Sequence, residues 1–287
     1  MASHSGKNVT CILLFRGGSG PAVARRILPP RFKLGGMAEG VAGTEVASWV
    51  ETPLGRYLIE REQTYFDRTV ADVFGYNAFQ LGMPELELLR ASRIPLRCRV
   101  GPGAGMDLRA DFRDLPIASN SADLVLLPHL LEFAEHPHQI LREVARVLMP
   151  EAQVILSGFN PFSLWGVRHA FHRRRDYPWR GRFLTLMRVK DWLALLGFEV
   201  IGGQMACYAP PARQQKWLER FSFMEKAGDR WWPVGGGVYF LQAVKRVRGV
   251  RLIMPKWSDR LAPAKRLAAS PQKLRDKEEA VTARTHD

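Results

Sequence analysis

Between residues 50 and 245 the apolar positions follow two different periods along the chain. Apolar residues at helical spacing predict amphipathic helices, and continuous apolar runs bounded by Gly or Pro predict buried strands. The first helix is predicted over residues 52–75, where Thr52 is a typical N-cap and Pro53 suits the first helical position. The apolar face of this helix comprises Leu54, Leu58, Tyr65, Phe66, Thr69 and Val73.

Further along the chain, predicted strands alternate with predicted helices. The strands are NAFQLG, IPLRCRVG, MDLRAD, ADLVLLP, AQVILSGFNP, FEVIGG and GVYFLQAVKR. The helices are MPELELLRAS, HPHQILREVARVLMP and TLMRVKDWLALL. The last proline of the second segment is expected to end that helix, and Gly197 is expected to end the third. Strands alternating with helices indicate an α/β fold with a doubly wound, mostly parallel sheet.

The two ends of the chain differ from this central part, which we take as one domain over residues 37–247. Residues 1–36 contain no acidic residue and are rich in Gly, Pro and Arg. We interpret them as a disordered arm or an extension from a start codon assigned too early, with a basic functional arm or transit peptide as the alternative. Residues 248–287 are basic and poorly periodic, which predicts a largely disordered tail.

Charge and cysteine content narrow the classes of protein that fit. The formal net charge of +14 predicts attraction to an anionic partner such as nucleic acid, a membrane surface or an acidic substrate. Cys11, Cys98 and Cys207 are widely spaced, so we expect no disulfide framework and no metal site. Since no apolar run approaches the ~20 residues that span a bilayer, and no signal peptide is evident, we expect a cytoplasmic protein.

An ordered series of motifs resembles one enzyme family. ADFRDLPI, SADLVLLPHLLEF, HPHQILREVARVLMPEAQVILSG and RVKDWLALLGFEV resemble class I S-adenosylmethionine-dependent methyltransferases of the type 11 branch. SGFNPFSLWGVR followed by FLTLMRVKDWLALLGFEV further resembles a bacterial subgroup of these proteins. The resemblance implies a Rossmann-like sheet of seven strands, with S-adenosylmethionine at the carboxyl ends of the strands.

Two neighbouring residues match the adenine-binding positions of this family. The resemblance implies that the Asp111 carboxylate accepts a hydrogen bond from the adenine amino group and that Phe112 borders the adenine ring. The alternative for Asp111 is an ordinary turn or capping aspartate.

The nucleotide loop departs from the family pattern, which reads as an acidic residue, Leu and then three spaced glycines. Here Gln80 replaces the acid and only Gly82 keeps a glycine position, so we predict both as cofactor contacts in a degenerate loop. The segment RCRVG also lacks the acid that binds the ribose, for which Glu85 or Glu87 is a substitute unless they are surface residues. The short chain between Gly82 and Asp111 predicts one reduced crossover.

His129 follows the buried run LVLLP, where an acceptor would meet the methyl group, so we predict it as a catalytic base; the alternative is a packing histidine. The basic segment 168–182 and the C-terminal tail predict contact with RNA or an anionic surface, with Tyr177, Trp179 or Phe183 available for stacking. The alternative is a solvated basic loop.

The sequence therefore supports two functional hypotheses. One is an S-adenosylmethionine-dependent methyltransferase whose acceptor is unidentified and either anionic or linked to RNA. The other is a methyltransferase-like binding or adaptor protein without catalytic activity, which the degenerate loop favours. Nothing in the sequence indicates an oligomeric state.

Overall fold

A computed structural model describes residues 41–171, 177–212, 214–221, 223–232 and 234–247. The predicted N-terminal arm 1–36, the predicted tail 248–287 and the middle of the basic segment 168–182 lie outside the described residues. The limits proposed for the central domain therefore stay a prediction.

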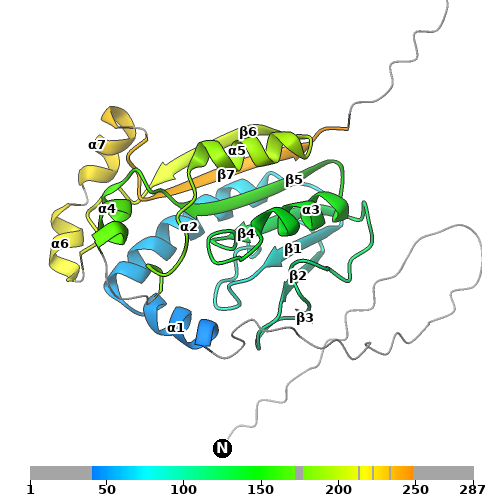
Figure 1. Cartoon of the computed structure of the whole chain (residues 1–287), viewed down its shortest axis with the longest axis horizontal. Coiled ribbons are helices and arrows are strands. Elements are labelled where there is room, and N and C mark those ends of the chain that lie inside the picture. The colour runs from blue at the N-terminus through cyan, green and yellow to red at the C-terminus, as the bar shows by residue number, and fades with distance from the viewer. Residues whose placement is uncertain (1–40, 172–176, 213, 222, 233, 248–287) are drawn as a thin grey trace, which may run out of the picture. The chain divides into compact units, whose positions relative to one another are not determined.

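A seven-stranded sheet forms the centre of the structure, in the order β3-β2-β1-β4-β5-β7-β6 (Figure 1). Strands β1 to β5 pair in parallel, whereas β7 runs antiparallel between β5 and β6. The predicted doubly wound, mostly parallel sheet is thus confirmed. The strands are β1 Asn77–Leu81, β2 Leu96–Gly101, β3 Leu108–Arg109, β4 Ala122–Pro128, β5 Leu148–Phe159, β6 Phe198–Ala206 and β7 Val238–Lys245.

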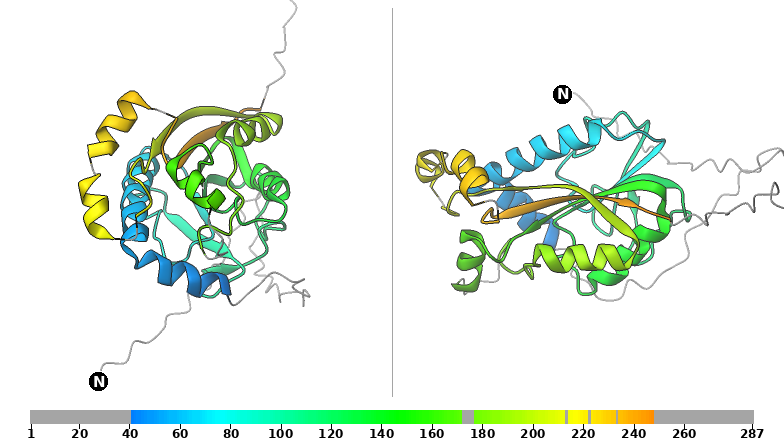
Figure 2. Two further views of the ribbon diagram at one scale, coloured as in Figure 1. Left: turned by 60° about the vertical axis from the view of Figure 1, so that its left-hand side comes forward. Right: turned by 90° about the horizontal axis from the view of Figure 1, so that it is seen from above.

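Helices cover both faces of the sheet (Figure 2). The helices are α1 Val41–Val50, α2 Pro53–Ala71, α3 Pro137–Val147, α4 Leu164–Phe171, α5 Leu186–Leu195, α6 Gln215–Arg220 and α7 Phe223–Trp231. Alternate residues of the buried strand β4 divide between two cores, as the period of a strand requires. Val125 and Leu127 belong to the core under α3 and α5, while Leu124 and Leu126 belong to the core under α2.

Local signals account for the ends of the helices. The Thr52 side chain accepts a hydrogen bond from the Gly55 amide, so this predicted N-cap of α2 is confirmed. After α5, Gly197 adopts a left-handed φ of 83°, which costs glycine little, and the chain turns into β6. The predicted end of α3 is wrong, because α3 ends at Val147 and Pro150 lies within β5. The register between β4 and β5 shifts there, which accommodates a residue without an amide hydrogen.

The predicted helix MPELELLRAS does not form. Residues 82–95 between β1 and β2, and residues 102–107 between β2 and β3, are described throughout and contain turns but no helix. Two connections are therefore reduced, where the chain length predicts one.

None of the helices in the described part of the chain is long and apolar enough to cross a bilayer.

Candidate functional site

The residues predicted to bind cofactor and acceptor gather at the carboxyl edge of the parallel strands. Gly82 follows β1, Gly101 ends β2, Asp111 lies just after β3, and His129 follows β4. In open α/β sheets this edge is where ligands bind. The fold thus brings the predicted residues to one edge, and their side chains decide what that edge can do.

Gln80 is fully buried in β1, and its side chain holds the loop that replaces the expected helix. Its amide nitrogen donates to the carbonyl oxygens of Met83 at 2.9 Å and Leu86 at 2.8 Å, and also to that of Gly82. Its amide oxygen accepts from the Leu88 amide at 3.2 Å. Buried backbone groups need such partners, so Gln80 stabilises a non-helical path. Its role in the described structure is in the loop, and its contact with cofactor stays a prediction.

The Phe112 ring lies over two glycines, Gly82 just after β1 and Gly101 at the end of β2. Gly82 has a left-handed φ of 86°, and a Cβ built there would lie 3.8 Å from Phe112 Cζ and 3.8 Å from Leu130 Cδ1. A Cβ on Gly101 would lie 2.8 Å from Met106 Cε and 3.1 Å from Phe112 Cζ. The ring therefore packs where the backbone carries no side chain.

Asp111 is paired with its neighbour Arg113. The Arg113 guanidinium donates to both carboxylate oxygens at 2.6–3.1 Å, and the Arg113 amide donates to Oδ1 at 2.9 Å. These hydrogen bonds outweigh burial and lower the pKa of Asp111, so it is ionised at neutral pH. The geometry is that of an aspartate turn, although 35% of the Asp111 side chain is exposed. The carboxylate is thus accessible to a ligand, and its contact with adenine stays a prediction.

His129 lies in a buried cluster of charges. The residue is 2% exposed and has a left-handed φ of 45°, and its ring packs on Phe159 with centroids 4.0 Å apart. Nε2 lies 2.8 Å from Glu62 Oε1 on α2, and Nδ1 lies 3.1 Å from Glu132 Oε2. Burial alone would lower the pKa of His129, but the charges of Glu62 and Glu132 raise it to about 10.

This cluster of Glu62, His129 and Glu132 bears on the predicted role of His129. A base must be unprotonated to accept a proton, and a pKa near 10 keeps the imidazole protonated at neutral pH. The catalytic assignment of His129 stays a prediction, and the described contacts favour the packing alternative.

Both acids of the cluster escaped the sequence reasoning. Glu62 is fully buried and its carboxylate accepts no aligned hydrogen bond from the described residues, so its main partner is the His129 charge. Glu132 also accepts from the amide of Phe159, which fixes the end of β5. A signal existed for Glu62: it lies four residues from both Leu58 and Phe66, on the apolar face of its helix.

The described part of the basic segment 168–182 corrects one expectation. Tyr177 and Trp179 are buried, so they are not available to stack on bases. Phe183 packs on His169 and Phe159, with ring centroids 4.2 Å and 5.0 Å apart. Trp179 and Phe183 pack on each other beside Trp165 of α4, whereas Tyr177 packs on Trp49 and Phe133. These aromatic rings therefore belong to the packed interior.

Three comparisons with known proteins agree with this architecture. Residues 90–156 match the type 11 family model described as "Methyltransferase domain". The chain is 33% identical over 156 residues to the protein YafS of Escherichia coli (strain K12). This match covers 53% of this chain and 65% of YafS. It is also 30% identical over 89 residues to malonyl-[acyl-carrier protein] O-methyltransferase of Methylovorus sp. (strain MP688). That match covers 31% of this chain and 30% of the relative.

A solved structure supplies the comparison of folds. An S-adenosylmethionine-dependent methyltransferase from Thermotoga maritima superposes with a TM-score of 0.54 and 14% identity, over 71% of this chain and 95% of the other. The chain has the class I methyltransferase fold. The two sequence matches span less than two thirds of either relative. They therefore do not identify the methyl acceptor of this chain.

Proposed function

We propose that this chain is an S-adenosylmethionine-dependent methyltransferase. The observation that carries the proposal is the carboxyl edge of a methyltransferase sheet that presents two glycine-ended strands, the Phe112 ring and the ionised Asp111. Once the Phe112 ring has moved off Gly101, a flat base would fit between the ring and backbone without side chains, and its amino group would donate to the carboxylate.

Each residue then has a distinct role in binding. Asp111 accepts from the adenine amino group, Phe112 covers the ring, and Gly82 allows the backbone to approach the cofactor. Gln80 holds the loop that presents Gly82. This role requires the Phe112 ring to move off Gly101, because Phe112 Cζ lies 3.1 Å from the position of a Cβ built there.

The reaction asks little acid–base chemistry of the protein. When bound, S-adenosylmethionine supplies a methyl group on a good leaving group, so positioning and exclusion of water provide most of the rate. The cluster of Glu62, His129 and Glu132 fixes the ends of β4 and β5. His129 would serve as a base only for an acceptor whose binding lowers the pKa of the imidazole.

Calorimetry with S-adenosylmethionine tests the proposal. We expect saturable binding that weakens roughly 10- to 100-fold in Asp111→Ala, because a hydrogen bond to a charged group is worth about 1.5–3 kcal/mol. Arg113→Gln frees the carboxylate and should retain or tighten binding, and Asp72→Asn, an exposed aspartate after α2, is the matched control. Absence of binding at millimolar ligand would refute the proposal.

A second candidate, a binding or adaptor protein, is favoured by one observation. The Gln80 amide is committed to the loop and provides no carboxylate for the cofactor's ammonium, and β2 ends in Gly101 without an acid. If the native chain gives no heat with S-adenosylmethionine, this candidate replaces the first.

We further propose that the acceptor or partner is anionic, on the basis of the net charge of +14. The affinity for RNA would then fall steeply with salt, in proportion to the number of phosphates contacted. Filter binding of a short single-stranded RNA across a salt series tests this, and a flat response would reject it.

A further inference from the structure

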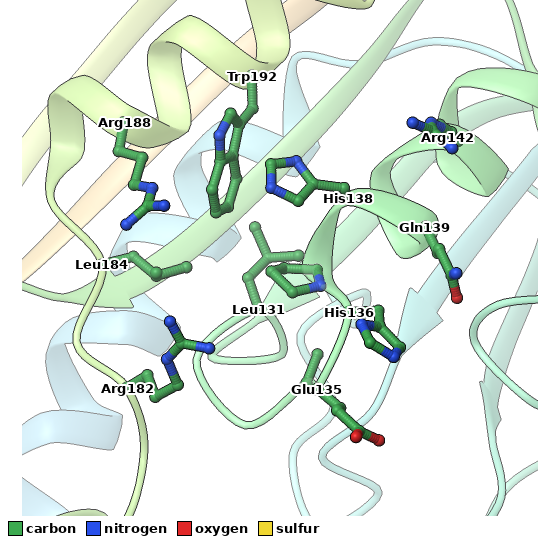
Figure 3. Close-up of a pocket in the computed structure, with 12 residues that line it drawn as sticks. Leu131, Glu135, His136, His138, Gln139, Arg142, Arg182, Leu184, Arg188 and Trp192 are labelled. Atoms are coloured by element: carbon green, nitrogen blue, oxygen red, sulfur yellow. The ribbon is translucent and has the colours of Figure 1, made fainter.

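A cavity of about 300 Å³ lies between α3 and α5, beside the loop that follows β4 (Figure 3). Its floor is apolar and includes Leu131 and Leu184, and its rim carries Arg182, Arg188 and His138. In Figure 3 Arg188 and Arg182 lie on the same side of the cavity, one on each side of the Leu184 side chain. A cavity of this size fits a small molecule rather than a polymer.

Among the described residues, no carboxylate neutralises the two guanidinium groups of this arginine cavity. Neither Arg182 nor Arg188 forms an ion pair with any carboxylate in the part of the chain that the structure describes. Glu135 also lines the cavity, and in Figure 3 its side chain points away from the two arginines. Paired guanidinium groups without a carboxylate favour a ligand with two negative charges, such as a phosphate monoester.

Trp192 gives the cavity one aromatic wall. Its ring lies 4.0 Å from the His138 ring between centroids, and the Arg188 guanidinium lies 5.3 Å from the indole centroid. Trp192 thus lies between Arg188 and His138 (Figure 3), and the edge of its ring lines the cavity. A ligand that carries its phosphate next to a planar group would contact the Arg188 guanidinium and this apolar edge.

The start of α3 adds to the positive potential of the cavity. The helix begins after His136, whose side chain makes no capping hydrogen bond, and it is 11 residues long. Pro137 has no amide hydrogen and the Gln139 amide donates to the His136 carbonyl, so the positive end of the helix dipole is the contribution of this turn, and it favours an anion nearby.

We propose that the arginine cavity binds the phosphate monoester of a small molecule that carries a planar group. The cavity is separate from the predicted cofactor edge but adjoins it: Leu130 faces Gly82, and the next residue, Leu131, lines the cavity. Binding in the cavity needs no cofactor, so its test is independent of the proposed methyl transfer.

Calorimetry of the full chain at about 0.15 M salt, with 1-naphthyl phosphate as the probe, tests the proposal. We expect saturable binding of one molecule, at least tenfold weaker binding of inorganic phosphate, and no binding of 1-naphthol. Arg188→Gln and Arg182→Gln should each weaken the aryl phosphate at least tenfold. Trp192→Leu should lower the affinity for 1-naphthyl phosphate until it is close to the affinity for inorganic phosphate.

Arg93→Gln is the matched control, because Arg93 is also an exposed arginine beside an aromatic ring, 5.8 Å from the Phe74 centroid. It should leave binding unchanged. Equal weakening in Arg93→Gln and Arg188→Gln would mean a general charge effect and overturn the proposal. Lack of saturable binding by the native chain would overturn it as well. Should Trp192→Leu fail to fold, the two exposed arginine variants decide the outcome.

Discussion

The buried cluster of Glu62, His129 and Glu132 makes a strong prediction about stability. His129→Asn removes the only cation of the cluster and leaves two buried carboxylates close together. Asparagine is the suitable replacement, because it tolerates the left-handed φ of 45° at this position better than most residues do. The variant therefore tests the charge with little contribution from backbone strain.

The expected loss is large. Removing one partner of a buried ion pair costs about 3–5 kcal/mol. For a domain of this size each kcal/mol lowers the melting temperature by about 2–4 °C, so we expect a fall of roughly 6–20 °C. The rise of the pKa of His129 from 6.5 to about 10 sets an upper bound of about 5 kcal/mol on the stabilisation by protonation, at about 1.4 kcal/mol per tenfold change in proton affinity.

The pH dependence has a definite sign. Since the folded protein binds the His129 proton more tightly than the unfolded chain, the stabilisation is complete below about pH 6.5 and is lost as pH rises towards 10. Urea unfolding of the native chain between pH 6.5 and 10 should show this fall, and His129→Asn should show much less of it. The double variant Glu62→Gln with His129→Asn should recover part of the loss, because one unpaired charge is removed.

A loss below about 1 kcal/mol in His129→Asn would contradict this reasoning, as would an identical pH profile in variant and native protein. Either result would mean that water or a neutral acid, and not the imidazolium, balances the cluster.

Two further predictions concern the loop after β1 and the predicted cofactor edge. Gln80→Leu should destabilise the chain by about 2–4 kcal/mol in urea unfolding, because it removes the hydrogen-bond partner of the Gly82 and Leu86 carbonyls and of the Leu88 amide. An unchanged midpoint would show that water replaces the amide. Gly101→Ala should cost less than about 1.5 kcal/mol, since its Cβ meets only flexible side-chain ends of Met106 and Phe112. The same variant should weaken S-adenosylmethionine at least tenfold in calorimetry, and unchanged binding would place the cofactor elsewhere.

The sequence predicts the sheet well, because its signals are local. Runs such as ADLVLLP are apolar over the length of a strand, and the structure contains that strand as Ala122–Pro128. Helices with a clear capping residue, such as the helix after Thr52, could be predicted from the sequence equally well. The helix predicted for MPELELLRAS does not form, although its apolar residues have helical spacing. The reason is that the Gln80 side chain forms hydrogen bonds with the backbone of this loop in a non-helical conformation.

The site was less predictable, because its contacts join distant parts of the chain. The approach of the His129 ring to Glu62 depends on how α2 packs on β4, and no spacing along the sequence specifies that contact. The pairing of Asp111 with Arg113 is local, but a turn aspartate and an adenine ligand share the same sequence signal. Tyr177 is buried and cannot stack on a base, and this burial is evident only in the packed structure.

The position of β7 has a consequence for how this protein is made. The strand that lies inside the sheet between β5 and β6 is the last one of the described chain to be synthesised. Until residue 245 has left the ribosome, β5 and β6 each expose an edge that only β7 covers, and such edges invite pairing with other chains. Completion of the sheet must therefore wait until almost all of the described chain has been synthesised.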